Sequence, residues 1–213
     1  MRKVILSLYW RSQVILVHLV SLQGSILHCI QGKQLRFIGT EHAFEENQTS
    51  SARADGAGAP GGPMGKALWD IRATLLLLGE GAWFDFGFYV HDFRFGGIAA
   101  RTQRFGFYWN LDPALKFGAA RLGPKPMVPA YAAMTWLLDG STSMGVLPGL
   151  SSSQRGYRFR RDGRITAAVW DPAGASALAV PTGTVVCDWF ANCAATTRKT
   201  VALGPQPVYL KLP

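Results

Sequence analysis

Residues 34–42, QLRFIGTEH, are the stretch around which the chain is organised. The apolar residues between 35 and 38 predict a buried strand, and Glu41 and His42 follow at its far end. Barrel enzymes place catalytic groups at the C-terminal tips of core strands, because the strand fixes the backbone while the next loop opens to substrate. A surface acid that happens to follow a strand would give the same short pattern, so the downstream sequence has to decide.

Two downstream segments complete a βαβ unit. Lys66–Leu78 (KALWDIRATLLLL) has apolar residues at helical spacing and predicts a helix, and Ala82–Asp92 (AWFDFGFYVHD) is aromatic and β-branched and predicts a strand. Strand, helix and strand in this order imply parallel neighbours joined by a right-handed crossover. We therefore expect Glu41, His91 and Asp92 at the same edge of the sheet.

The sequence after residue 140 changes to short strands separated by turns. Tyr157–Arg161 and Arg164–Trp170 flank an Asp-Gly pair, which favours a type I′ hairpin turn. Aromatic residues of the first strand alternate with Arg158 and Arg160, so both arginines are expected to point to solvent from one face. A helix is predicted before these strands, at Pro129–Leu138.

Four further strands are predicted in the same region: Ala177–Val180, Thr184–Trp189, Thr200–Leu203 and Val208–Leu212. Several short strands at regular spacing indicate a small antiparallel β-sandwich over residues 141–213. The fold class expected for the whole chain is therefore α/β followed by all-β.

The net charge of +9 comes from 22 basic and 13 acidic residues. Such a balance is compatible with nucleic acid or an anionic surface as a partner. The basic residues are spread along the chain, however, and only Arg155 to Arg164 form a dense group. Zinc-finger spacing and a helix-turn-helix pattern are both missing from the sequence, so we expect a solvated basic surface and no nucleic-acid partner.

The cysteine and histidine patterns predict neither a disulfide framework nor a metal site. Cys29, Cys187 and Cys193 are the three cysteines, and only a Cys187–Cys193 bridge across a turn would be feasible. His42 and Glu45 are three residues apart, but the HExxH pattern and cysteine pairs at zinc spacing are missing from the sequence. We expect no metal and no cofactor.

The N-terminal region, residues 1–31, is apolar, and Ser12–Ile30 within it carries no formal charge. Its length would span a bilayer, but His18 and Gln23 weaken an anchor and no clear cleavage site supports a signal peptide. A buried helix is favoured, with membrane anchoring through Ser12–Ile30 as the alternative and a cytoplasmic or secreted location left open. Residues 47–65 are rich in Gly, Ala, Ser and Pro and predict a mobile loop.

Several motifs occur in an order that resembles a known family. They are Gly39-Thr40-Glu41, Tyr89-Val90-His91-Asp92, Gly106 to Pro113 (GFYWNLDP), Pro124-Lys125-Pro126, Ala130 to Met134 (AYAAM) and Leu203 to Leu210 (LGPQPVYL). From about Gly32 to its C-terminus, the chain resembles the C-terminal part of bacterial retaining glycoside hydrolases of the (β/α)8 clan that includes β-xylosidase-like and cellulase-like enzymes. In those proteins a barrel is followed by a small β-sandwich.

The resemblance implies a domain division and a set of site residues. Residues 32–140 would be a partial (β/α)8 barrel with its last two strands and helices, and residues 141–213 the sandwich. Glu41 would be the nucleophile at the end of the seventh barrel strand, attacking the anomeric carbon of a carbohydrate substrate. The residues expected to line the sugar subsite are His42, Tyr89, His91, Asp92 and Trp109.

The sequence also departs from this pattern. A complete barrel needs roughly 250 residues, more than the 213 present, and the Asn-Glu pair that supplies the general acid in such enzymes is missing. The chain is therefore expected to be a fragment or truncated relative that hydrolyses aryl glycosides weakly. The alternative is a non-catalytic carbohydrate-binding or interaction module. An unpaired barrel edge predicts self-association of the full chain, whereas the sandwich is expected to close on itself and to fold well from about Met127.

Overall fold

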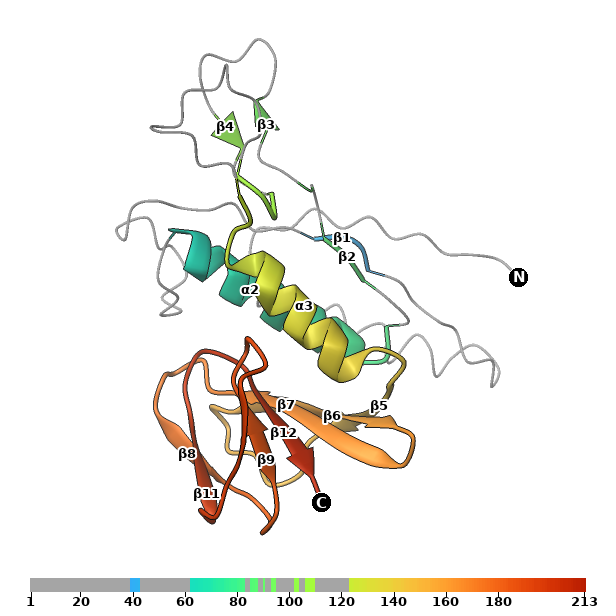
Figure 1. The fold of residues 1–213 in the computed structure, drawn as a ribbon, viewed down its shortest axis with the longest axis vertical. Coiled ribbons are helices and arrows are strands. Elements are labelled where there is room, and N and C mark those ends of the chain that lie inside the picture. The colour runs from blue at the N-terminus through green and yellow to red at the C-terminus, as the bar shows by residue number, and fades with distance from the viewer. Residues whose placement is uncertain are drawn as a thin grey trace, which may run out of the picture.

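The computed structural model describes residues 39–42, 62–82, 85–87, 90, 93–94, 102–103, 106–109 and 123–213. The apolar region 1–31, with the helix, signal and anchor interpretations of Ser12–Ile30, lies outside the described residues. Among those that are described, no helix is long and apolar enough to cross a membrane. The architecture is a mixture of two helices and mostly antiparallel strands in this described part of the chain (Figure 1).

A parallel βαβ unit begins the described structure, as the sequence predicts. Strand β1 (Gly39–His42) pairs in parallel with β2 (Asp85–Gly87), and α2 (Gly62–Gly79) connects them. The register aligns Gly39 with Asp85 and His42 with Gly87. The helix begins earlier than predicted, so 62–65 are not part of a loop, because Pro63 suits a first helical turn and Gly65 is buried.

A six-stranded antiparallel sheet with the order β10-β9-β12-β7-β6-β5 forms the C-terminal region. The second helix, α3 (Met127–Leu138), precedes it, and two-stranded pairs are formed by β8 with β11 and by β3 with β4. The strands are β3 (Phe93–Arg94), β4 (Thr102–Gln103), β5 (Thr142–Val146), β6 (Arg155–Arg161), β7 (Arg164–Trp170), β8 (Ser176–Ala179), β9 (Val185–Cys187), β10 (Cys193–Ala195), β11 (Thr200–Leu203) and β12 (Val208–Leu212).

The predicted hairpin is confirmed. Strands β6 and β7 pair up to Arg161 and Arg164, and Asp162 and Gly163 have φ values of 50° and 76°, as a two-residue turn of the primed type requires. Arg160 is exposed as expected. Arg158 is half-buried, so its prediction as a solvent-facing residue is wrong, and its Nε is buried without a hydrogen-bond partner in the described structure.

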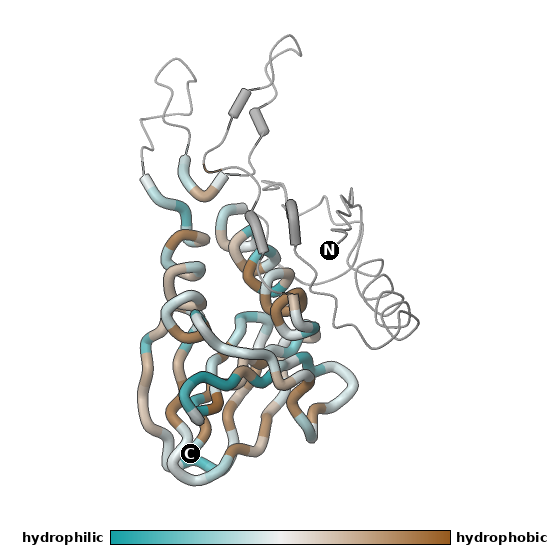
Figure 2. Tube along the Cα trace, turned by 90° about the vertical axis from the view of Figure 1, so that its right-hand side faces the viewer, coloured by the Kyte–Doolittle hydropathy of each residue, from teal (hydrophilic) through white to brown (hydrophobic). Residues whose placement is uncertain are grey.

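The sheet is covered on both faces, because strands with alternating side chains present apolar residues to either side. One core cluster joins the helices to Tyr157, Phe159, Ala168, Trp170 and Tyr209. A second cluster joins Ala167, Val169 and Leu210 of the sheet to Leu178 of β8 and Leu203 of β11. Figures 1 and 2 both show α2 and α3 stacked on one side of the strands.

The expectation that the sandwich closes on itself is therefore wrong. Its large aromatic face is covered by α2 as well as α3, and polar contacts fix this arrangement. Tyr157 donates a hydrogen bond to Glu80 at 2.8 Å, the Arg72 Nε donates to the Pro205 carbonyl at 2.8 Å, and Ser143 donates to the Gly79 carbonyl. The helix layer is thus part of the same packed body as the sheet.

The one disulfide that the sequence left feasible is present, because Cys187 and Cys193 are bonded. These two residues face each other directly in the β9–β10 pairing, with a Cα–Cα distance of 3.9 Å. Sequence spacing made the bridge feasible, but only the antiparallel register of two short strands brings the two sulfur atoms together.

Candidate active site at the edge of the parallel strands

Glu41 and His42 are the last two residues of β1, at the carboxyl edge of the parallel pair. His42 lies opposite Gly87, the last residue of β2. Strand β2 therefore ends at the same edge as β1, which is the edge at which Glu41 lies. Tyr89, His91 and Asp92 themselves lie outside the described residues, so their predicted roles stay predictions.

A short backbone segment, residues 106–109, lies between Val90 and the residues that lead into α3. The Tyr108 N–H donates to the Val90 carbonyl at 2.9 Å, which places the segment beside the chain that follows β2. On its other side, Tyr108 forms a bridge with Pro124, and the Trp109 N–H donates to the Gly123 carbonyl at 3.0 Å. These pairings bring predicted substrate-binding residue Trp109 next to the residues that lead into α3.

Trp109 is half-buried, and the Nζ atom of Lys125 lies 4.8 Å from the centre of its ring. A cation over an indole face is attracted by the ring quadrupole, and this attraction increases where water is excluded. Lys125 is only 1% exposed, so the contact is desolvated. Lys125 thus holds the indole in a fixed orientation, a positioning role that the sequence motif Pro124-Lys125-Pro126 did not reveal.

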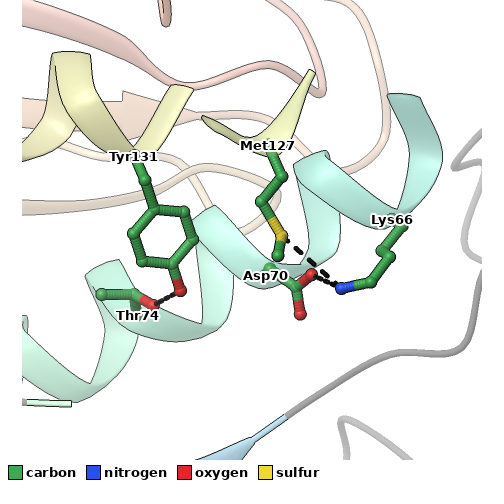
Figure 3. A network of polar contacts seen from close by, with 5 residues as sticks. All are labelled: Lys66, Asp70, Thr74, Met127 and Tyr131. Carbon is green, nitrogen blue, oxygen red and sulfur yellow. Dashed lines mark hydrogen bonds and ion pairs between the residues drawn. The ribbon is translucent and has the colours of Figure 1, made fainter. Parts of the chain in front are cut away.

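Polar contacts join the two helices along their length (Figure 3). Lys66 pairs with Asp70 one turn further along α2, and its Nζ lies 3.5 Å from the sulfur of Met127 in α3. Further along both helices, the hydroxyls of Thr74 and Tyr131 lie 2.7 Å apart. Lys66 precedes Thr74 in α2, and their partners Met127 and Tyr131 follow the same order in α3. The two helices therefore run in the same direction, with their N-termini at one end.

The contacts between the helices continue to residues 106–109. The rings of Phe107 and Tyr131 meet edge to face, with centroids 4.9 Å apart, so the segment that carries Trp109 packs on α3. A removed partner would leave a charge of the Lys66–Asp70 pair buried and uncompensated, which is strongly destabilising. The sequence did contain a signal for this pair, namely Lys and Asp four residues apart in a mostly apolar helix.

A second polar junction anchors α2 to the far end of β7. Burial lowers the pKa of Arg72 to about 10, while the carboxylate of Asp171 acts in the opposite direction. Hydrogen bonds lower the pKa of Asp171, with that from Ser176 as the largest cause. Ser153 and the Ala173 N–H also donate to this carboxylate, at 3.0 and 2.9 Å. At neutral pH both groups are therefore charged.

Groups of three or more His, Cys, Asp or Glu side chains that could hold a metal ion do not occur in the described part of the chain. Comparison of the sequence with known protein families and with curated proteins finds no match. The chemistry of the candidate site must therefore be argued from its own residues. These are Glu41 and His42 at the end of a parallel strand, and Trp109, whose ring contacts the buried ammonium group of Lys125, in the segment that pairs with Val90 after β2.

Proposed function

We propose that this chain is a glycoside-hydrolase-like protein in which Glu41 is the nucleophile of a retaining reaction. The observation that carries the proposal is the placement of Glu41 at the carboxyl end of a parallel strand in a βαβ unit. Catalytic groups of parallel barrels lie at this end of their strands. Trp109, whose ring contacts Lys125, lies in the segment that pairs with Val90 after β2 and suits a sugar subsite, since ligand pockets combine aromatic walls with a few polar groups.

The helices support the finer proposal that residues 32–140 are the last two βα units of a (β/α)8 barrel. Helices of consecutive units in such a barrel run in the same direction outside the strands, as α2 and α3 do. The C-terminal sheet, with residues 141–213, then corresponds to the sandwich that follows the barrel. It packs on both helices, as a domain placed outside the barrel would.

The proposed reaction follows from the groups assigned. Retention of configuration needs one carboxylate to attack the anomeric carbon and a second carboxyl group to protonate the leaving oxygen. Glu41 supplies the attack and would become a glycosyl ester as the bond to the leaving group breaks. The sequence lacks the Asn-Glu pair that would supply the acid. Catalysis by these residues should therefore depend strongly on how readily the leaving group departs without a proton.

This dependence gives a direct test. Dinitrophenyl 2-deoxy-2-fluoro-glycosides of xylose and glucose carry a leaving group that needs no protonation, and the fluorine slows breakdown of the ester. Incubation with the full chain is expected to add the mass of one fluoroglycosyl group, and peptide mapping should place it on Glu41. Unactivated aryl glycosides should turn over weakly or not at all.

Two variants control the experiment. Glu41→Gln should abolish labelling, whereas Glu45→Gln removes a nearby carboxylate of the same type and should leave labelling unchanged. Labelling that persists in Glu41→Gln, or no labelling with either sugar, would overturn the assignment of the nucleophile. Efficient hydrolysis of unactivated aryl glycosides that disappears in Glu41→Gln would show that a general acid is present after all.

A further inference from the structure

A groove of about 530 Å³ lies away from the strand edge, at the other end of α3. It is bounded by the end of α3, the hairpin between β6 and β7, and the last two residues of β12. The side chains that matter for its chemistry are Trp136, Arg161, Asp162, Arg164 and Lys211. None of them has a role in the proposed glycosidase site.

The sheet register explains why these residues meet. Arg161 is paired with Arg164 in the hairpin, and Lys211 is paired with Thr166. Since side chains alternate along a strand, Arg164 and Thr166 share the face of Ala168, which packs against the helices. The sheet extends past the end of α3, and its helix-facing surface becomes the floor and rim of the groove.

Trp136 provides an aromatic wall. Its side chain is 61% exposed, although an indole is costly to leave in water, and the Nζ of Lys211 lies 4.8 Å from its ring centre. Lys211 thus orients the ring while much of its surface stays accessible. A rigid, accessible indole beside polar groups is the arrangement that stacks on the apolar face of a sugar ring and hydrogen-bonds its hydroxyls.

The rim of the groove carries excess positive charge. Arg161 and Arg164 lie directly opposite each other, a placement of like charges that destabilises a strand pair. Arg161 is held in place, because its Nη1 donates to the Asp139 carbonyl at 2.6 Å. With Lys211 there are three cationic groups against the single carboxylate of Asp162. An anion bound between them would relieve this repulsion.

We propose that this groove binds an acidic sugar, a pyranose that stacks on Trp136 and places its carboxylate against Arg164 and Lys211. Asp162 accepts hydrogen bonds from sugar hydroxyls and disfavours a polyphosphate chain. The proposal rests on the proposed function only in taking a carbohydrate as the ligand class. It assigns a binding site separate from Glu41, suited to holding charged polysaccharide while the strand edge acts on it.

The test uses tri-galacturonate and its neutral methyl ester as probes of the full chain, by titration calorimetry at low ionic strength. The acid is expected to bind at least tenfold more tightly than the ester, with an affinity that falls as salt is added. Trp136→Ala should weaken binding of both probes at least tenfold. Lys211→Met and Arg164→Gln should each weaken binding of the acid at least fivefold. Arg164→Gln, which keeps the contact between Lys211 and Trp136, should leave binding of the ester unchanged and so separates charge recognition from stacking.

Val146→Ala is the matched control, because Val146 is also a large exposed apolar side chain, at 59%, but lies outside the groove. It should change neither affinity. Glu41→Gln should also bind both probes normally, so a failed nucleophile assignment would not be confused with a failed groove. Equal binding of acid and ester, unchanged binding in all three groove variants, or preferential binding of a single-stranded oligonucleotide would each overturn the proposal.

Discussion

The two faces of the six-stranded sheet are built differently. The face towards the helices is aromatic, with Trp170, Tyr209 and Phe159 all buried against α2 and α3. The opposite face is made of small and aliphatic side chains such as Ala167 and Val169, and it is covered by β8 and β11 together with Leu147 and Leu150 of the loop after β5. Because successive side chains of a strand point to opposite faces, one sheet can present rings to the helices and small aliphatic groups to the strands on its other side.

This difference shows that the stability of the sheet depends on a layer contributed by another part of the chain. The β8–β11 layer comes from the same C-terminal stretch as the sheet, so it is present whenever the sheet is. Helix α2, by contrast, comes from the βαβ unit of the proposed catalytic region, yet it contributes Leu68, Ile71 and Leu75, each at most 1% exposed, to the same core. The proposed catalytic and sandwich regions should therefore unfold together.

The largest expected effect follows from removing that helix. A shortened chain that begins at Met127 keeps α3 but loses three core side chains, whose burial contributes about 1.5–3 kcal/mol each to the free energy of unfolding. This loss is a large share of the total for a typical domain, about 5–15 kcal/mol. It also uncovers the ring of Tyr157. We expect it to aggregate or to melt without cooperativity, as followed by size-exclusion chromatography and near-UV circular dichroism.

A chain that begins at Gly62 is the control for this experiment, since it retains α2 and should keep a cooperative transition. The result that would contradict the comparison is a monodisperse, cooperatively melting chain from Met127. Self-association of the full chain through the edge of β1 stays a separate prediction, which the same chromatography at several concentrations would check.

The contact between α2 and the sheet can be tested at a single atom. A Cβ atom added at Gly79 would lie 2.2 Å from the Tyr157 ring, so helix and sheet would have to move apart. We expect Gly79→Ala to lower the free energy of unfolding by about 1–3 kcal/mol, the usual cost of overpacking. The matched variant is Gly123→Ala, where the added atom meets nothing within 4 Å. Its free energy of unfolding, measured by urea denaturation, should change by no more than about 0.5 kcal/mol. Equal changes for the two variants would mean that α2 is not held tightly against β6.

The smallest effect separates two tyrosines on the same aromatic face. Tyr157 donates to Glu80, and Tyr157→Phe should cost about 0.5–1.5 kcal/mol in the free energy of unfolding because that bond is lost. Tyr209 is fully buried, burial raises its pKa, and its hydroxyl has no hydrogen-bond partner in the described structure. Tyr209→Phe should therefore be neutral or stabilising in the same chemical denaturation experiment. A larger loss from Tyr209→Phe than from Tyr157→Phe would reverse this assignment of polar contacts.

Local features of the fold could be predicted because their causes are local. Apolar residues at helical spacing predicted α2, and a proline at the start with Asp139-Gly140 at the end predicted α3. The Asp162-Gly163 pair predicted the hairpin, since few residues other than glycine accept positive φ without strain. The order of strand, helix and strand predicted the parallel pairing of β1 and β2 and so the edge at which Glu41 lies. These inferences need only neighbours in the sequence or the handedness of a crossover.

The sequence by itself thus determined both helices, the hairpin, most strands of the C-terminal region and the edge that carries the candidate nucleophile, but it did not indicate β3, β4, β5 or β10. Only the tertiary structure decided that α2 covers the sheet, that Cys187 meets Cys193, and that Lys125 lies over Trp109. It also decided that Trp136 and Lys211 share one groove. The physical reason is the same in each case. Contacts between distant segments depend on how whole layers pack, and no local pattern of polarity or spacing specifies which partner a buried side chain will meet.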